Sequence, residues 1–151
     1  MSVDDLTPFE KLSLQMEFAV PLIRGLQAQL GEQAVNDALD RMHAANTAAA
    51  REAATPESTL PLAANRAFFE HWGQNALDYE VKRDDEAGFD VDVTGCRYAK
   101  MMAGLDAQDI GERLVCNYDF ASSAGVGQTL TRTQTCMRGA SHCDFRFTKA
   151  D

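Results

Sequence analysis

The stretch that decides the fold is Leu130-Thr-Arg-Thr-Gln-Thr-Cys136-Met-Arg-Gly139-Ala-Ser-His142-Cys143-Asp144-Phe-Arg-Phe147. Its two halves, on either side of Gly139, predict two short antiparallel strands joined by a glycine turn, a C-terminal β-hairpin. The same residues hold two thiols, an imidazole, a carboxylate and three guanidiniums. A purely structural hairpin rarely concentrates so many reactive groups, so we interpret the segment as part of an enzyme.

Strand alternation divides these reactive groups between two faces. If the turn holds an even number of residues, the expected cross-strand pairs are Cys136–Cys143, Gln134–Phe145 and Arg132–Phe147. In either register, the apolar face carries Cys143, Phe145 and Phe147. The opposite face carries His142, Asp144 and Arg146. Because His142 and Cys143 then point in opposite directions, their adjacency in sequence does not predict a Cys–His dyad.

The first half of the chain is predicted to be helical. The expected helices cover residues 8–30, 32–54 and 62–74. In the first, the inward apolar stripe is Leu12, Met16, Ala19, Val20, Ile23, Leu26 and Leu30. Thr7-Pro8 provides a cap and a first turn, Gly31 marks the end, and Pro21 is expected to kink or break the helix.

Beyond residue 76 the hydrophobic period changes to that of strands. Apolar and polar residues alternate over 77–82 and 89–93, with a hairpin turn predicted between them. Helices are predicted over 96–103 and 107–113, whereas 114–116 fits either a helix or a short strand. We therefore expect one α+β domain over residues 1–151. The helices of 1–75 would pack on a small, mainly antiparallel sheet that ends in the C-terminal β-hairpin.

Charge and hydropathy restrict the partners of the protein. The net charge is −9 and no basic stripe offsets it, so we expect no nucleic acid. No apolar run approaches the ~20 residues of a membrane span, so we expect no membrane. Residues 1–6 lack the apolar segment of a signal peptide, which predicts a cytoplasmic protein with reduced thiols. We expect a small-molecule substrate and no cofactor, and leave a homo-oligomer open.

The cysteines are candidates for core residues, metal ligands or nucleophiles. Cys96 follows Thr94-Gly95, where a strand is expected to enter a helix. A helix N-terminus lowers the pKa of a thiol, which makes Cys96 the first candidate nucleophile. Tyr98 can donate a hydrogen bond to a developing oxyanion. Cys96 and Cys143 can equally be packed core thiols.

A second candidate group surrounds Cys116. Asp119 lies three residues later, so a helix or turn makes the thiol and the carboxylate neighbours. Asp119 can act as a general base, hold a substrate ammonium group or cap a short helix. Arg132 has the fork geometry that binds a carboxylate, or is an exposed strand residue. The cysteine spacing contains no Cys-x-x-Cys pair, so a zinc site is only weakly indicated.

Three segments resemble the L-2-amino-thiazoline-4-carboxylic acid hydrolase family. They are Gly95-Cys-Arg-Tyr-Ala99, Leu114-Val-Cys-Asn-Tyr-Asp119, and Leu130-Thr-Arg-Thr-Gln-Thr with Gly139-Ala-Ser-His-Cys-Asp-Phe-Arg-Phe147. The last segment is the most specific, and the three follow the expected order through the second half of the chain. The positions associated with the family's motifs are Cys96, Cys116, Asp119, Thr133, Cys143 and Asp144. Cys136 stands where an aliphatic residue is expected.

The resemblance implies hydrolysis of a non-peptide carbon–nitrogen bond in a small cyclic amidine such as the family's namesake thiazoline carboxylate. As a mechanistic hypothesis, a thiolate, Cys96 first and Cys143 second, attacks the ring carbon and water releases the product. Asp119 or His142 would move protons and Arg132 would bind the substrate carboxylate. The catalytic candidates are Cys96, Cys116, Asp119, His142 and Cys143. The substrate-binding candidates are Tyr98, Arg132, Thr133 and Asp144.

Other functions and mechanisms stay open at this point. Helices on an antiparallel sheet with clustered thiols also suit a module that binds or senses a small molecule, a metal or a tetrapyrrole. A scaffold subunit, in which the thiols are only core residues, is a third class. For an enzyme, the alternative to a cysteine nucleophile is attack by water with a carboxylate as the base.

Overall fold

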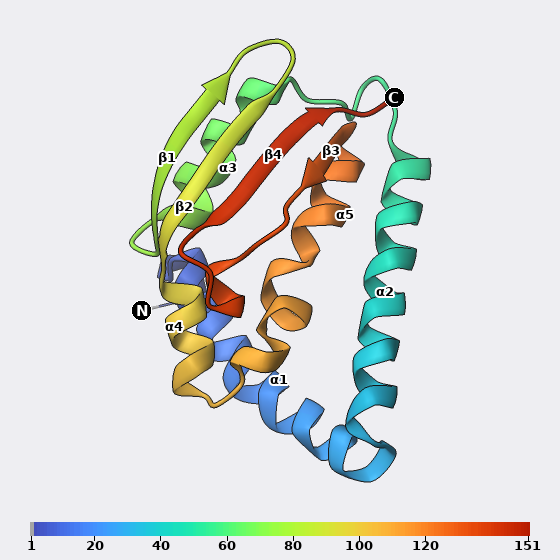
Figure 1. Cartoon of the computed structure of the whole chain (residues 1–151), viewed down its shortest axis with the longest axis vertical. Coiled ribbons are helices and arrows are strands. Elements are labelled where there is room, and N and C mark those ends of the chain that lie inside the picture. Colours follow the sequence, from blue (N-terminus) through green and yellow to red (C-terminus); the bar gives the residue numbers. More distant parts are fainter. Residues whose placement is uncertain (1) are drawn as a thin grey trace.

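Four antiparallel strands form the sheet of the computed structural model, which describes residues 2–151. The strands are β1 (Leu77–Asp84), β2 (Phe89–Cys96), β3 (Gln128–Thr131) and β4 (Cys143–Lys149). Their order across the sheet is β1–β2–β4–β3, so that β4, the last in sequence, lies between β2 and the short edge strand β3 (Figure 1). The predicted α+β class and the antiparallel pairing of the two C-terminal strands are confirmed.

One face of the central strands is apolar. Along β2, Phe89, Val91 and Val93 are almost fully buried and alternate with half-buried aspartates. Along β4, the buried residues are Cys143, Phe145 and Phe147, which confirms the predicted apolar face. Val91 pairs with Phe145, and Val93 with Cys143, so the two buried rows lie side by side.

The predicted glycine turn between β3 and β4 is wrong. Residues 132–142 join the strands and include a short 3₁₀ helix, η5 (Cys136–Arg138). Leu130 therefore pairs with Phe147, in place of the three cross-strand pairs expected for a tight turn. The physical reason is the Asp144 carboxylate, which accepts hydrogen bonds from two consecutive backbone N–H groups of this connection at 2.8 and 2.9 Å. These N–H groups are thereby removed from the strand ladder.

Two long helices and a short one precede the sheet. They are α1 (Pro8–Leu30), α2 (Glu32–Ala53) and α3 (Asn65–Gly73), with 3₁₀ turns η1 (Val3–Asp5) before α1 and η2 (Leu62–Ala64) before α3. The Thr7 hydroxyl caps α1 by accepting the Glu10 N–H at 3.2 Å, and Gly31 ends it with a φ of 94°. The helix runs through Pro21, so the break considered at that position does not occur.

Only the first part of the predicted inward stripe of α1 faces the core. Met16 and Val20 are 6% and 5% exposed, whereas Leu26 and Leu30 are 39% and 65% exposed. Figure 1 shows the reason: the C-terminal end of α1 extends beyond the sheet before the chain turns into α2. The predicted orientation of the last two residues of the stripe is therefore wrong.

A run of short helices connects β2 to β3. They are α4 (Arg97–Gly104), the 3₁₀ helix η3 (Gln108–Ile110), the π-helix η4 (Glu112–Cys116) and α5 (Tyr118–Gly125). The helix predicted over 96–103 is confirmed, whereas 107–113 divides between η3 and the start of η4. Residues 114–116 belong to the π-helix, a rare conformation that is frequent at functional sites.

Two apolar clusters form the core. One joins α1 and α4 to the η3–η4 segment and includes Met102 and Ile110, both fully buried. The other joins α3 to the sheet and includes Phe69 and Val91. Cys96 packs against both clusters, so the thiol at the end of β2 marks their junction.

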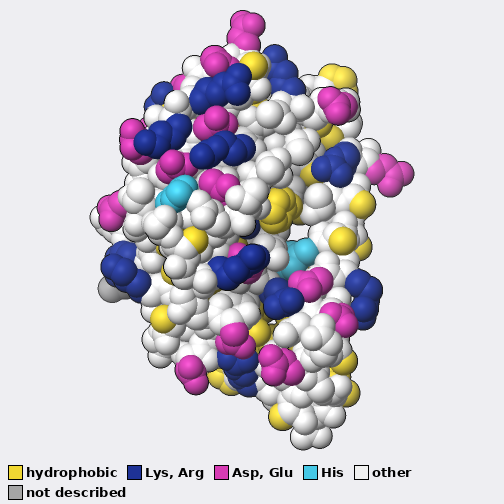
Figure 2. Space-filling view, in the orientation of Figure 1, with side chains coloured by type: hydrophobic (Ala, Val, Ile, Leu, Met, Phe, Trp, Pro, Cys, Tyr) yellow, Lys and Arg dark blue, Asp and Glu magenta, His cyan; other side chains and the backbone are white. Residues whose placement is uncertain are grey.

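Charged side chains of both signs cover the surface. Figure 2 shows Lys and Arg side chains interspersed with Asp and Glu over the visible face. Surface ion pairs such as Arg24–Asp109 and Arg66–Asp84, each with 2.7 Å between nitrogen and oxygen, are part of this pattern. Within residues 2–151, no helix has both the length and the apolar character needed to cross a membrane.

Candidate active site

A cavity of about 410 Å³ opens between the two apolar clusters. Side chains from α1, α3, α4, η4, α5 and the central strands line it. Six of the nine predicted site residues are among them: Cys96, Tyr98, Cys116, Asp119, Arg132 and Cys143. The volume falls within the range of about 300–1,000 Å³ typical of small-molecule sites. Residues that are far apart in the sequence therefore converge on one space.

Asp119 and Arg132 form an ion pair at the cavity. Arg132 Nη1 donates to Asp119 Oδ2 at 2.9 Å, and Nη2 donates to the carbonyl oxygen of Cys116 at 3.2 Å. The side chain of Arg132 is 3% exposed and that of Asp119 is 24% exposed. Arg132 is thus a buried cation with a carboxylate partner, and the alternative of an exposed strand arginine is wrong.

Two aromatic rings hold the Arg132 guanidinium. Its central carbon lies 5.1 Å from the ring centroid of Phe120 and 5.0 Å from that of Phe145. The rings contact the guanidinium through cation–π interactions while its nitrogens donate hydrogen bonds. The orientation of Arg132 is therefore determined within the protein itself.

The pKa of Asp119 is raised above its ordinary value of 3.8. Burial raises it by disfavouring the charged carboxylate, and the charge and hydrogen bond of Arg132 oppose the rise without cancelling it. A carboxylate with a raised pKa on a cavity wall has the property expected of a general base.

Cys96 occupies the helix start that the sequence predicts. It is the N-cap of α4, and its Sγ accepts the Ala99 N–H at 3.4 Å. The predicted lowering of its pKa is nevertheless wrong, because burial raises the pKa and outweighs the helix N–H group. The adjacent Arg97 guanidinium is engaged elsewhere: it donates to the Asn75 carbonyl at 2.6 Å and lies 4.4 Å from the Phe9 ring centroid.

Cys116 ends the π-helix η4 at the cavity. Burial raises the pKa of its thiol well above 9.0, although the nearby Arg132 acts in the opposite direction. The thiol is therefore protonated at neutral pH. The contribution of Cys116 that the structure shows directly is its carbonyl oxygen, which helps to position the Arg132 guanidinium.

Cys143 and Cys136 form a thiol pair at the start of β4. Cys143 Sγ accepts the backbone N–H of Cys136 at 3.2 Å, and Cys136 Sγ donates to the Val93 carbonyl at 3.4 Å. Burial raises the pKa of Cys143 to about 12. Within the described residues, no group of three or more His, Cys, Asp or Glu side chains is arranged to hold a metal ion.

Tyr98 lines the cavity and fastens α4 to α3. Its hydroxyl donates to the Trp72 carbonyl at 2.8 Å, and burial raises its pKa to about 12. The Tyr98 hydroxyl, which was predicted to donate to an oxyanion, therefore already donates its hydrogen bond to a backbone carbonyl near the end of α3.

Thr133, His142 and Asp144 lie outside the set of residues that lines the cavity. Asp144 accepts the Thr133 hydroxyl at 2.5 Å, in addition to the two N–H groups described above. Burial would raise the pKa of Asp144, but these hydrogen bonds outweigh it and the net shift is downward. His142 is within hydrogen-bonding distance of Gln134 at 2.9 Å and Ser141 at 3.0 Å. The structure therefore places Thr133 and His142 in the connection between β3 and β4, and Asp144 at the start of β4, where it binds that connection.

Other cavity residues were missed by sequence reasoning. Thr135 is 3% exposed, and its hydroxyl donates to Glu112 at 2.6 Å while it caps η5 by accepting the Arg138 N–H at 3.1 Å. No spacing rule marks such a residue. Phe68, Phe69 and Trp72 also line the cavity. Their clustering on the predicted third helix was the signal that could have identified them.

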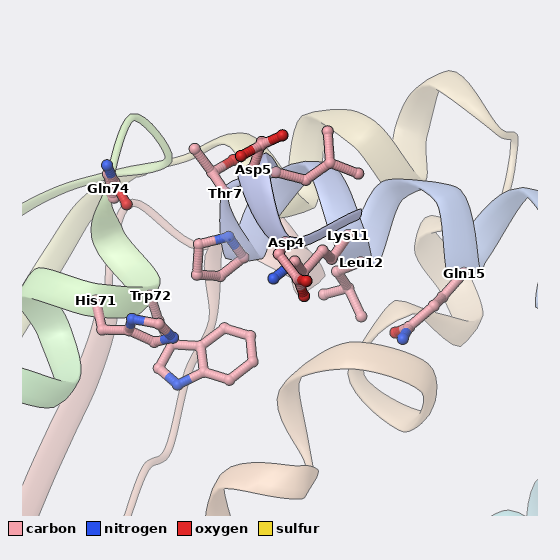
Figure 3. A pocket seen from close by; sticks show the side chains of 11 residues that line it. Asp4, Asp5, Thr7, Lys11, Leu12, Gln15, His71, Trp72 and Gln74 are labelled. Atoms are coloured by element: carbon pink, nitrogen blue, oxygen red, sulfur yellow. The ribbon is translucent and has the colours of Figure 1, made fainter. Parts of the chain in front are cut away.

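A second groove adjoins the cavity beside α1. Figure 3 shows Lys11 of α1 on one side of this groove and His71 and Trp72 of α3 on the other. Leu12, Gln15 and Trp72 line both the groove and the cavity. Because Trp72 is 40% exposed, it marks an entrance to the cavity.

Comparison with protein families gives a match over most of the chain. The sequence model of the family described as L-2-amino-thiazoline-4-carboxylic acid hydrolase matches residues 13–147. This range contains all nine predicted site residues and nearly all of the cavity lining. A search of curated proteins found no match.

Proposed function

Because the chain belongs to the L-2-amino-thiazoline-4-carboxylic acid hydrolase family, we propose that it opens a small cyclic amidine by hydrolysing a non-peptide carbon–nitrogen bond. The family description names a hydrolase of a thiazoline carboxylate. The observation that supports the proposal is the convergence of Asp119, Arg132 and three thiols on one cavity of about 410 Å³.

Asp119 is the proposed general base. Its carboxylate takes a proton from water while the water oxygen bonds to the amidine carbon. The ring nitrogen then takes the proton back from Asp119 and leaves the tetrahedral carbon, which breaks the carbon–nitrogen bond. The hydroxyl of that carbon becomes the carbonyl of the product, and its proton passes to the freed nitrogen. The sum is the addition of one water molecule with opening of the ring. Arg132 favours the ionised form of Asp119 and attracts the carboxylate of the substrate.

The thiols are proposed to shape the cavity. Burial raises the pKa values of Cys96, Cys116 and Cys143, so each thiolate is scarce at neutral pH. The competing mechanism is nucleophilic attack by Cys96 or Cys143, which requires a base to remove the thiol proton first. Replacement of single cysteines separates the two mechanisms.

Incubation of the purified protein with 2-amino-thiazoline-4-carboxylate tests the proposal. We expect mass spectrometry to detect carbamoyl-cysteine with the wild type and with the Asp109→Asn control, whose carboxylate pairs with Arg24 at the surface. We expect the product to be lost with Asp119→Asn. Absence of product from the folded wild-type protein would overturn the assignment of this substrate class.

A binding or sensor module is the second candidate, and the buried, protonated thiols and aromatic lining of the cavity favour it. Trp72 is the single tryptophan of the chain and lines the cavity, so an occupied cavity should change its fluorescence. A fluorescence change without any product would favour this candidate. A Soret band in the spectrum of the purified protein would identify the ligand as a tetrapyrrole.

A further inference from the structure

A row of aromatic rings leads from the ion pair to the surface. The Phe145 centroid lies 5.0 Å from the central carbon of Arg132, and that of Phe69 lies 5.1 Å from Phe145. Phe68 follows at 5.4 Å from Phe69, and Trp72 at 6.4 Å from Phe68. All four rings line the cavity, and we call them the aromatic row.

The aromatic row presents mainly apolar surface to a ligand. Phe69 and Phe145 are 1% and 7% exposed, and exposure rises to 40% at Trp72. The ion pair of Asp119 and Arg132 lies at the inner end of the row. The 410 Å³ of the cavity is equivalent to roughly fourteen water molecules at ~30 Å³ each, more than one small polar ring fills.

We propose, building on the proposed function, that the natural substrate is a cyclic amidine with an apolar substituent that lies along the aromatic row. The polar ring would meet Asp119 and Arg132, while the substituent would displace water from Phe69, Phe68 and Trp72. Burial of apolar surface then supplies binding free energy that an unsubstituted thiazoline carboxylate does not provide.

A series of ring carboxylates with hydrogen, methyl, propyl or benzyl substituents tests this inference. We expect kcat/KM, and affinity measured by Trp72 fluorescence, to rise about fourfold for each added methylene until the row is filled. Phe68→Ala, at a half-buried position that lines the cavity, should remove most of this gain, so that kcat/KM and affinity rise much less along the series than they do in the wild type. Leu60→Ala is the control, because Leu60 is 47% exposed and lies outside the cavity lining.

The outcomes separate this inference from the proposed function. If the unsubstituted ring is hydrolysed and substituents bring no gain, the apolar substituent is wrong and the hydrolase stands. If no ring is hydrolysed but affinity rises with the substituent in the wild type and falls in Phe68→Ala, the hydrolase is wrong and the ligand class stands. A gain that Phe68→Ala leaves intact would also overturn the placement along the row.

A separate feature, the exposed apolar side chains along the outer face of α1, supports a second inference. Five apolar residues follow one another there at four-residue steps and are 39–74% exposed: Leu14, Phe18, Leu22, Leu26 and Leu30. We call these residues the α1 strip. They expose roughly 500 Å² of apolar surface, at the upper end for a monomeric protein. That area approaches the ~600 Å² per partner of the smallest specific interfaces.

We infer that the α1 strip pairs with the same strip of a second copy about a two-fold axis. The two helices run in opposite directions and cross at roughly 50°, because residues at four-residue steps form a ridge that winds around the helix. Phe18 and Gly25 lie two helical turns apart on one face, so this arrangement packs the ring of one copy against the glycine of the other. No atom lies within 4 Å of a Cβ built at Gly25, so the single copy gives no steric reason for a helix-weakening glycine. From Leu14 to Leu30, the exposed residues of α1 include a single charge, Glu17.

Sedimentation equilibrium over a range of protein concentrations tests this pairing. We expect a wild-type dimer that tightens with salt, because each copy carries a net charge of −9. Phe18→Glu and Gly25→Leu should each weaken it more than tenfold, with circular dichroism confirming the fold, whereas Leu60→Glu should not. A wild type that stays monomeric at every concentration, or a dimer insensitive to Phe18→Glu, would overturn the inference.

Discussion

Asp119 and Asp144 belong to the same set of predicted site residues but have opposite environments. Asp119 lies on the cavity wall, where burial raises its pKa and Arg132 only partly opposes the rise. Asp144 is less deeply placed, and hydrogen bonds from Thr133 and Gln134 outweigh its burial and lower its pKa. A carboxylate that accepts several hydrogen bonds from its own chain stabilises the fold. A carboxylate with a raised pKa beside a cavity is suited to proton transfer.

The largest expected effect separates the two carboxylates by activity. Asp119→Asn should lower kcat by about 10²–10⁴, because the proposed base is lost while the amide oxygen can still accept from Arg132. Asp144→Asn should stay within about tenfold of the wild type when activity is normalised to the folded fraction. Steady-state turnover measures both. Equal losses of kcat in the two variants would contradict the assignment of proton transfer to Asp119 alone.

The next effect concerns the cation beside Asp119. Arg132→Met should lower the free energy of unfolding by about 3–5 kcal/mol at pH 7, because it leaves a buried carboxylate without its partner. The loss should shrink as the pH falls, since protonation of Asp119 removes the uncompensated charge. Urea denaturation at several pH values measures this. Arg113→Met, which removes a pair with surface-exposed Asp40, is the matched control and should cost less.

Asp144 should show its role in stability. Asp144→Ala should lower the free energy of unfolding by about 1–3 kcal/mol at neutral pH, through lost hydrogen bonds from Thr133 and Gln134. The pKa of Asp144 is lowered in the folded protein, so its contribution is present above the ordinary value of 3.8 and disappears as the pH falls through the folded pKa. Thermal unfolding from pH 7 to pH 2 should show the two proteins converging. A difference that persists at the lowest pH would contradict this origin.

The thiols should contribute less to catalysis than Asp119. Cys96→Ser and Cys143→Ser should each keep turnover within about tenfold of the wild type, because water rather than a thiolate is the proposed nucleophile. A loss of three orders of magnitude in either folded variant would instead identify that thiol as the nucleophile. In that case, single-turnover assays of the wild-type protein with mass spectrometry would show a covalent adduct on that thiol.

The smallest effect is expected at His142. His142→Ala should change kcat by no more than about threefold, because the imidazole contacts Gln134 and Ser141 outside the cavity lining. The pH profile of the variant should overlay that of the wild type. If the variant instead loses one of the pH-dependent limbs of the wild-type activity profile, His142 transfers a proton in the reaction.

Features that depend on neighbours in sequence could be predicted. The Thr7 cap, the hairpin of β1 and β2, and the inward positions of Cys143, Phe145 and Phe147 all follow from local chemistry and from the two-residue period of strands. The start of α4 at Cys96 was predicted for the same reason.

Features that depend on distant contacts could not be predicted. The Asp119–Arg132 pair joins residues 13 positions apart on different elements, and no spacing rule links them. The helix start at Cys96 is visible in the sequence, but the burial that reverses its pKa shift is a property of the assembled core. The prediction of a tight turn at Gly139 was wrong because Asp144 accepts hydrogen bonds from the backbone N–H groups of Gln134 and Thr133, which lie 10 and 11 residues earlier in the chain.

The pH dependence of kcat/KM tests most directly whether Asp119 is the base. We predict an acid limb in which activity falls as the pH drops through a pKa above 3.8, retained in Asp144→Asn and abolished with the activity in Asp119→Asn. A profile that is flat through this range and rises toward the pKa of about 12 of Cys143 would contradict it and identify a thiolate as the reacting group.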